Sequence, residues 1–357
     1  MARHIQNERP RPDDNMEFTS LDKVSNEQWD RYASGSSRSS IYHLSPWSRL
    51  IKKLFGHESH YIAALENGTI CGILPLVRLK SVIFGDFMIS MPYFNYGGAI
   101  GNSKEIEEGL MDYAREMGRE LKLDHIEFRD LRERSDIPVR TDKVCMHLKL
   151  PGSEDELWRS FPSKLRSQVR RPKKEGVETV VGSDELVDDF FQIFSRNMRD
   201  LGTPVYPIGF FREIISTFRE HVAIVVVYHH HRPVAGAFLI GFKGMLEIPW
   251  ASSLREYNRI SVNMALYWKV LRYAIENGYH TFDFGRSTKG SGTYKFKKQW
   301  GAVEKQLYWY YWINGEAGTL PELNPRNPKY QLAIQAWKRL PVPVANYLGP
   351  MIVKNLP

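Results

Sequence analysis

One order of apolar and polar stretches occurs twice along the chain. Two short apolar runs separated by a polar turn lie at residues 60–77 and again at residues 222–240. In the first copy the turn contains Asn67-Gly68, a pair that favours a two-residue β-hairpin. In the second copy residues 229–233 reverse the chain. Each copy therefore begins with a predicted antiparallel hairpin.

A further strand and a helix follow the hairpin in both copies. Phe87–Tyr93 and Met245–Trp250 are apolar runs that end in loops with glycine or serine, and they predict strands. Residues 104–121 and 261–277 carry apolar side chains every three or four positions, which predicts a helix in each copy. The repeat therefore continues beyond the hairpins.

Each predicted helix leads into a short strand that contains one acid. The acid is Glu127 in the first copy and Asp283 in the second. Two copies of hairpin, strand, helix and strand predict an α+β protein with two similar domains packed side by side. We expect a flexible N-terminus, two domains and a proline-rich helical tail that packs on the body, at residues 1–20, 21–150, 151–315 and 316–357.

Charge and cysteine content narrow the class of protein. The 357 residues include 49 Lys and Arg against 41 Asp and Glu, and this basic excess favours anionic partners such as phosphates, RNA or a membrane surface. We expect no DNA partner. Two cysteines exclude a disulfide framework and a cysteine-rich zinc site, and we expect no metal. Without a signal segment or a long apolar run, a cytoplasmic location is expected, at the inner face of the membrane if the protein serves the envelope.

The segment Phe282–Gly301 holds the most informative candidate chemistry. It leaves an apolar strand at Asp283 and becomes a loop of small residues with several cations and no further acid. Small residues let a ligand approach backbone N–H groups, and cations add charge for an anion. The alternation of aromatic and cationic residues predicts a strand with two different faces, although a solvated basic loop is the alternative. The candidates here are Asp283, Arg286, Ser287, Tyr294, Lys295, Phe296, Lys297 and Trp300.

Two other segments carry candidate binding residues. Leu157–Pro172 combines an apolar stripe with a basic face that includes Lys164 and Arg170, which predicts an amphipathic helix that binds phosphate-rich substrate or RNA. The loop before residue 261 brings Arg255 and Asn258 to a helix N-terminus, where anions bind. The alternatives are a solvated helix over the domain junction and simple capping of the second helix.

The sequence resembles the FemAB-related transferases, in particular the subgroup associated with the exosortase/PEP-CTERM system. The resemblance covers the chain from about residue 42 onward, and its sharpest part is the Phe-Lys-x-x-Trp-Gly signature at Phe296, Lys297, Trp300 and Gly301. Other matching parts are Ala251–Trp268, Leu201–Pro204, Trp337–Pro341 and Leu348–Pro350.

The resemblance implies two tandem GNAT-like domains and transfer of an acyl group to an amine. In the family the lysine of the Phe-Lys pair stabilises the oxyanion. The corresponding lysine in this sequence is Lys297. The best-known members take an amino acid from aminoacyl-tRNA to a peptidoglycan precursor. This chain shows neither the long heptad arm of many such members nor the glycine-bearing acetyl-CoA motif. The donor is therefore left open between aminoacyl-tRNA and acyl-CoA or acyl-carrier protein, with no tightly bound cofactor.

These observations lead to three hypotheses. The first is an acyl- or aminoacyltransferase that acts on an envelope or exopolysaccharide precursor. Lys297 would stabilise the oxyanion, Arg286 and Lys295 would hold phosphate, and Asp283 would orient the loop or assist proton removal, while Tyr294 and Trp300 wall the cleft. The second is an N-acyltransferase that uses acyl-CoA or acyl-carrier protein. The third is a non-catalytic module that binds RNA or an anionic lipid-linked precursor, and a peripheral membrane contact is left open.

Overall fold

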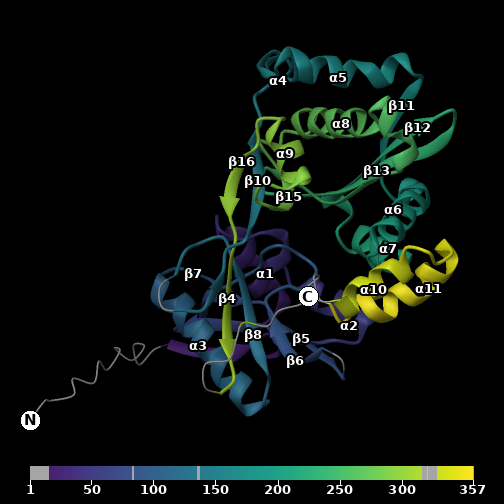
Figure 1. Ribbon diagram of the computed structural model, residues 1–357. Coiled ribbons are helices and arrows are strands. Elements are labelled where there is room, and N and C mark those ends of the chain that lie inside the picture. Colours follow the sequence, from purple (N-terminus) through teal and green to yellow (C-terminus); the bar gives the residue numbers. More distant parts are fainter. Residues whose placement is uncertain (1–15, 83, 135–136, 316–319, 321–327, 357) are drawn as a thin grey trace, which may run out of the picture.

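Two sheet-containing halves lie one against the other in the computed structural model (Figure 1). The structure describes residues 16–82, 84–134, 137–315, 320 and 328–356. In this part of the chain no helix is long and apolar enough to cross a bilayer. The first described element is β1 (Met16–Ser20), so residues 16–20 are a strand rather than the expected flexible segment, and residues 1–15 lie outside the described part.

The described residues of the first half form two sheets and three α-helices. The sheets have the strand orders β1-β3-β4-β7 and β2-β5-β6-β8-β17-β9. Their strands, besides β1, are β2 (Glu58–Ser59), β3 (Ile62–Glu66), β4 (Thr69–Leu74), β5 (Val77–Ser81), β6 (Gly85–Ile89), β7 (Ile100–Gly101), β8 (His125–Asp130), β9 (Val139–Arg140) and β17 (Tyr308–Ile313). The helices are α1 (Asn26–Gly35), α2 (Pro46–Phe55) and α3 (Lys104–Glu120).

The second half is built on one seven-stranded sheet with the order β11-β12-β13-β14-β15-β10-β16. Its strands are β10 (Lys143–Lys149), β11 (Val177–Gly182), β12 (Val222–His229), β13 (Arg232–Phe242), β14 (Met245–Ser253), β15 (Thr281–Thr288) and β16 (Val303–Gln306). The helices are α4 (Glu154–Ser160), α5 (Ser163–Lys174), α6 (Val187–Leu201), α7 (Ile208–Thr217), α8 (Val262–Glu276) and α9 (Gly292–Lys298), followed by α10 (Pro328–Trp337) and α11 (Val342–Val353).

The internal repeat extends to strand register. In the first half β6 pairs with β8 in parallel over three residues, and the last pair joins Ile89 to Glu127. In the second half β14 pairs with β15 in parallel over three residues, and the last pair joins Glu247 to Asp283. The acid that ends each copy therefore occupies the same place in both sheets.

The two halves exchange strands. β10 lies before residue 151 but pairs with β15 in the second sheet, and β17 lies after the second repeat but pairs with β8 in the first. Sheet membership therefore does not follow the expected boundary between residues 150 and 151. Alternation of side chains cannot reveal this, because it identifies a strand but not its partner.

Proline and capping account for two further differences from expectation. The expected helix over Leu157–Pro172 is divided into α4 and α5 at Phe161-Pro162, since proline cannot donate the next helical hydrogen bond. The expected strand over Tyr294–Lys297 is the short helix α9. Ser291 caps it by accepting a hydrogen bond from the backbone N–H of Tyr294 at 3.2 Å.

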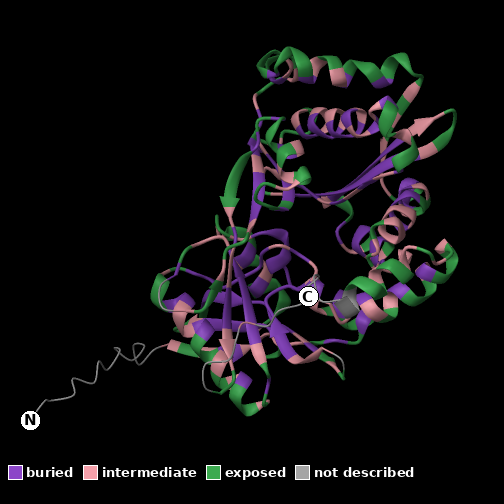
Figure 2. Cartoon of the chain, in the orientation of Figure 1, coloured by how far each residue is buried: buried purple, intermediate pink, exposed green. Residues whose placement is uncertain are grey.

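The junction between the halves is part of a hydrophobic core. Trp47 and Phe94 from the first half pack in the same cluster as Phe210, Phe211 and Trp250 from the second. Separate clusters lie between the second sheet and helices α5 and α8, and between the first half's strands and α3. Figure 2 shows the central strands of both halves buried, while β16 and much of the outer helices are exposed. The shared core fixes the polar residues at the junction in place.

Candidate active site

The second sheet opens next to Asp283. Parallel pairing of β14 and β15 stops at Glu247 and Asp283, yet β14 continues to Ser253 and β15 to Thr288. The backbone groups beyond this point on the facing edges are therefore not used in pairing between these two strands. The candidate site lies at this opening.

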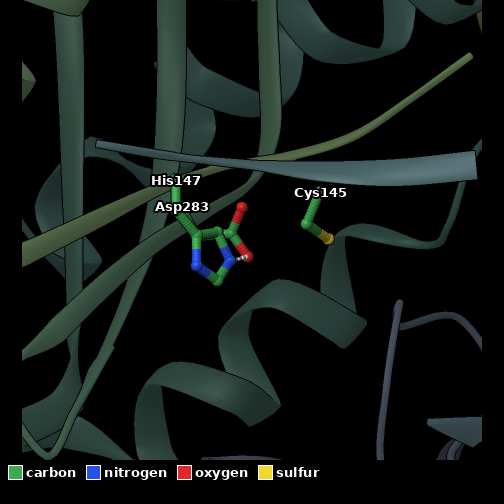
Figure 3. A group of neighbouring side chains, drawn as sticks. All are labelled: Cys145, His147 and Asp283. Atoms are coloured by element: carbon green, nitrogen blue, oxygen red, sulfur yellow. Dashed lines mark ion pairs between the residues drawn. The ribbon is translucent and has the colours of Figure 1, made fainter. Parts of the chain in front are cut away.

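Asp283 is a fully buried acid at the opening. Its Oδ1 accepts a hydrogen bond from the backbone N–H of Gly285 at 2.7 Å, and its Oδ2 accepts one from the Tyr96 hydroxyl at 3.2 Å. His147 Nε2 on β10 lies 3.3 Å from the same Oδ2 (Figure 3). Gly285 has a φ of +73°, a conformation that favours glycine, and the register between β15 and β10 shifts at this point, so the strand is locally distorted immediately after the acid. These contacts hold the carboxylate in one orientation.

Glu247 is a second buried acid beside Asp283. It accepts hydrogen bonds from the Tyr42 hydroxyl at 2.6 Å and the Asn95 side-chain amide at 3.4 Å, and it shares the single hydroxyl proton of Tyr96, at 3.3 Å, with Asp283. Burial and the nearby negative charge of Asp283 raise the pKa of Glu247 to about 8. Its carboxyl is therefore mostly protonated at neutral pH. The three donors all come from the first half, so this acid joins the two halves.

Lys297 is a buried cation on α9. Its Nζ donates hydrogen bonds to the backbone carbonyls of Gly285 at 2.9 Å and Arg286 at 2.8 Å, and 7% of the residue is exposed. Burial lowers the pKa of Lys297 to about 8, and the charge of Asp283 opposes that shift. An ammonium has three N–H donors. Two are used by these carbonyls, which leaves one for a ligand.

Two arginines flank the site at the junction. The guanidinium carbons of Arg129 and Arg286 lie 4.5 Å and 5.0 Å from the centre of the Trp309 ring on β17. Arg129 is paired with Glu127, its Nε lying 2.6 Å from Oε1. Arg286 is exposed and has no carboxylate partner among the described residues. Its charge is therefore available to an anion.

A cavity of about 320 Å³ borders this cluster on the first-half side. Tyr96, Arg129 and the backbone of Gly97 and Gly98 form part of its wall, and the other cations around it are Arg38, Arg132 and Lys305. A smaller cavity of about 20 Å³ shares Tyr96 with it and reaches Glu247. Asp130 also lines the larger cavity, and Arg38 and Arg132 are both paired with the buried Glu107, so charges of both signs surround it.

The structure brings some of the predicted site residues together. Asp283, Arg286 and Lys297 meet around Gly285, and Ser287 lies buried on the same strand, its hydroxyl without a partner in the described part of the chain. Lys295 is exposed on α9.

The expected aromatic wall is not formed. Trp300 is 1% exposed and packs in the core under α8, with Tyr294 and Phe296 half-buried against the same core. Tyr294 directs its hydroxyl to Glu304. The helical conformation of α9 explains the difference, since it turns these rings toward α8 instead of alternating them across a strand.

The other predicted binding residues lie elsewhere. Arg255 and Asn258 are exposed in a short 3-10 helix (Arg255–Ile260) that precedes α8. Lys164 and Arg170 are exposed on α5, which packs on the outer side of α8 (Figure 1). They form surface patches apart from the Asp283 cluster.

Sequence reasoning missed most of the residues around Asp283. Glu247 had a local signal, because it is the one acid in the apolar run Met245–Trp250. The others come from distant parts of the chain and had no such signal, namely Tyr42, Asn95, Tyr96, Arg129, His147 and Trp309.

Cys145, His147 and Asp283 form a group with the side chains of a metal site. One ligand atom from each lies within 4.8 Å of the others (Figure 3). A metal needs the thiolate form of cysteine. Burial and the charges of Asp283 and Glu247 raise the pKa of the Cys145 thiol well above its ordinary value, and both oxygens of Asp283 already accept hydrogen bonds. We assign no metal to this group.

The sequence and the fold of this chain are similar to those of several known proteins. Residues 159–298 match the acetyltransferase (GNAT) domain family. The chain is 25% identical over 224 residues to a protein named lipid II:glycine glycyltransferase from Staphylococcus epidermidis, in two strains, covering 55% of this chain and 52% of that protein. The chain thus spans about half the length of the curated relatives it matches. The crystal structure of FemX matches 89% of this chain and all of its own, with a TM-score of 0.63 and 18% identity.

The fold of the chain is therefore similar to that of FemX. A tandem GNAT protein from the clavulanic acid pathway has a similar fold, with a TM-score of 0.52, 11% identity and coverage of 85% of this chain and all of that one. The predicted α+β fold with two GNAT-like domains is thereby confirmed. The expected class, a GNAT- and FemX-like acyl- or aminoacyltransferase, agrees with these similarities.

Proposed function

We propose that this FemX-like protein transfers an acyl or aminoacyl group to the amine of a cell-envelope or exopolysaccharide precursor. The observation that carries the proposal is the position of Lys297, a buried ammonium beside the opening between β14 and β15 with one N–H free of the two carbonyls it binds. A hydrogen-bond donor held in this way is already oriented before substrate arrives. It can therefore stabilise the negative charge that develops in the transition state without reorganising.

The chemistry follows from charge development. The amine of the acceptor attacks the carbonyl carbon of an activated ester or thioester, and a C–N bond forms while the carbonyl oxygen becomes an oxyanion. Lys297 donates to that oxygen. Collapse of the intermediate breaks the bond to the leaving oxygen or sulfur, and the proton lost by the amine ends on that leaving group. Positioning by the two halves supplies much of the remaining rate.

The cations at the junction support an anionic acceptor or donor. Arg286 is exposed without an ion-pair partner in the described residues, and Lys305 lines the adjacent cavity, where Arg38 and Arg132 are already paired with Glu107. Arginine suits the bidentate geometry of a phosphate. An anionic lipid-linked precursor fits this charge, and the name of the Staphylococcus epidermidis relative includes lipid II.

The donor has two candidates, aminoacyl-tRNA and an acyl thioester of CoA or carrier protein. The FemX-like fold supports the first, and the GNAT match over residues 159–298 supports the second. Membership of the exosortase/PEP-CTERM-associated subgroup is part of this proposal and rests on the sequence resemblance alone.

The deciding experiment supplies the purified full chain with bulk aminoacylated tRNA or a panel of acyl-CoAs. Each donor is tested with a lipid-linked muropeptide and with an amino sugar as acceptor, and mass spectrometry detects a new amide. Amide formation from charged tRNA supports the aminoacyl branch, and formation from acyl-CoA supports the other.

Binding measurements separate an enzyme from a binding module. Donor and acceptor affinities are measured across a salt series in the same samples, since a purely electrostatic interaction weakens steeply with salt. If anionic ligands bind and no amide forms with any pair, the transferase proposal is wrong and a non-catalytic module is favoured.

A further inference from the structure

α11 presents an apolar stripe to solvent. The helix contains no charged residue, and Val344, Tyr347, Leu348 and Met351 are 41%, 70%, 36% and 51% exposed. These positions follow the spacing i, i+3, i+4 and i+7, so they share one face of the helix. Four large apolar side chains on one exposed face are unusual enough to call for an explanation.

The opposite face of α11 is fixed to the body of the protein. Ala345, Gly349 and Val353 are buried, and a Cβ atom at Gly349 would lie 2.8 Å from the backbone nitrogen and oxygen of Val205. This close approach sets the rotation of the helix about its axis. The exposed stripe is therefore held outward by packing.

α10 continues the same arrangement. Ile334 lies against Gly202, while Leu332, two positions earlier in the helix, is 73% exposed. Figure 1 shows α10 and α11 side by side at the edge of the molecule, next to α6 and α7. Figure 2 shows exposed segments along both helices. Together, α10 and α11 form an outer helical layer at this edge of the molecule.

The charged residues of α10, α11 and the turn between them are all basic. Residues 323–357 contain five basic residues and no acid: Arg326, Lys329, Lys338, Arg339 and Lys354. Within the described part, Lys338 and Arg339 stand between α10 and α11 and are at least partly exposed. An apolar stripe that has cations and no acid within its own segment complements a surface with an apolar interior and a negatively charged outer layer.

The anionic face of a lipid bilayer has this combination. We propose that α10 and α11 dock this protein peripherally on an anionic membrane, with Tyr347, Leu348 and Met351 in the headgroup boundary and Lys338 and Arg339 on lipid phosphates. A specific protein interface buries about 800 Å² per partner, which the stripe of four side chains does not offer. The proposal concerns location and does not depend on the transfer reaction.

The test is flotation of the full chain with vesicles at two compositions. Vesicles of phosphatidylcholine with one third phosphatidylglycerol are compared with phosphatidylcholine alone, at low and physiological salt. We expect binding to the anionic vesicles that weakens with salt. The double variant Tyr347→Ser with Met351→Ser is expected to bind about tenfold less tightly or worse, because it removes most of the buried apolar area. Lys338→Gln with Arg339→Gln should reduce binding to anionic vesicles only.

Val180→Ser is the matched control, since Val180 is 43% exposed on β11 in the other part of the molecule. Thermal unfolding verifies the fold of each variant, and Leu332→Ser serves as a second stripe variant. Absence of vesicle binding by the unaltered chain would overturn the proposal. So would equal binding by the stripe variants, which would point to the basic face of α5. A dimer that the stripe variants dissociate would show that a second copy covers the stripe instead.

Discussion

Lys297 shows how burial and hydrogen bonding prepare a side chain for chemistry. Its ammonium is removed from water but is compensated by the carbonyls of Gly285 and Arg286 and by the charge of Asp283. Packing alone does not explain why a buried lysine lies beside the edges of β14 and β15 that are not paired with each other. The proposed oxyanion role therefore makes quantitative predictions for this residue.

Replacing Lys297 by alanine should lower the rate of amide formation by about 10²–10³-fold, the usual effect of removing one oxyanion donor. The reason is that the charge on the carbonyl oxygen then develops without a partner. Steady-state kinetics, with whichever of the two candidate donors forms the amide, measure the effect. Lys298→Ala removes the same charge from an exposed position of α9 and should leave the rate within about twofold. Equal losses in both variants would contradict the proposed role.

The pH dependence of transfer should report the state of Lys297. Because its pKa is lowered to about 8, its charge is lost as pH rises through that value, and the rate should fall above about pH 8. Lys297→Arg keeps its charge throughout this range and should lack this fall, even if its rate is lower. Glu247 titrates in the same range, so the pH–rate profile of the Glu247→Gln variant must also be measured. If the fall disappears in Glu247→Gln and persists in Lys297→Arg, it belongs to Glu247.

The residues of the site differ in how far the sequence could predict them. Asp283, Arg286 and Lys297 lie within one short segment, so composition and resemblance suffice to select them. Tyr42 and Tyr96 are far from Glu247 in sequence, and only the packing of one half on the other brings their hydroxyls to its carboxyl. Predicting contacts of this kind requires knowledge of how the two halves are arranged.

At the scale of elements, periodicity predicted the repeated strands and helices well. It failed where a local feature decided the outcome. Ser291 caps α9 and makes a helix of an alternating segment, and Pro162 divides one apolar stripe into α4 and α5. The exchange of β10 and β17 between sheets leaves no periodic trace, because either sheet accepts an alternating strand.

The packing of α11 gives a prediction at this scale. Gly349→Ala places a Cβ 2.8 Å from the Val205 backbone, so the helix must move outward, and we expect a loss of about 1–3 kcal/mol in the free energy of unfolding. Hydrogen exchange should show faster exchange in α11 specifically. Gly209→Ala, in α7, is the matched control because a Cβ there meets nothing within 4 Å. That variant should be neutral or stabilised by up to about 1 kcal/mol through helix propensity. Identical behaviour of the two variants would show that α11 is not held as described.

At the scale of the molecule, the two halves are joined by an apolar core and by hydrogen bonds to buried acids. Tyr42, Asn95 and Tyr96 of the first half donate to Glu247 of the second, and Tyr96 also reaches Asp283. Both acids stand at the end of the parallel pairing that opens the second sheet. The same contacts therefore set the relative position of the halves and the shape of the proposed site.

This junction should make the stability of the whole molecule depend on pH through Glu247. Its pKa is raised from 4.5 to about 8 in the folded state, so its contribution is fully present below about pH 4.5 and is lost as pH rises through about 8. Ionisation at high pH would place a second negative charge beside Asp283 in a buried site. Glu247→Gln keeps the shape and the hydrogen bonds of the side chain but cannot ionise. We expect it to reduce the fall in stability between pH 5 and 8.5 by an amount on the order of 2 kcal/mol.

Denaturant unfolding at several pH values measures this difference. Glu178→Gln, an exposed acid on β11 of the same sheet, should give a curve parallel to that of the unaltered chain. If Glu247→Gln gave a parallel curve as well, Glu247 would be ionised in the folded protein at neutral pH. The tyrosine hydroxyls would then be stabilising a charge at the junction instead of holding a neutral acid. Tyr42→Phe separates these cases, because losing a donor to a carboxylate costs about 1.5–3 kcal/mol, whereas losing one to a neutral carboxyl costs about 0.5–1.5 kcal/mol.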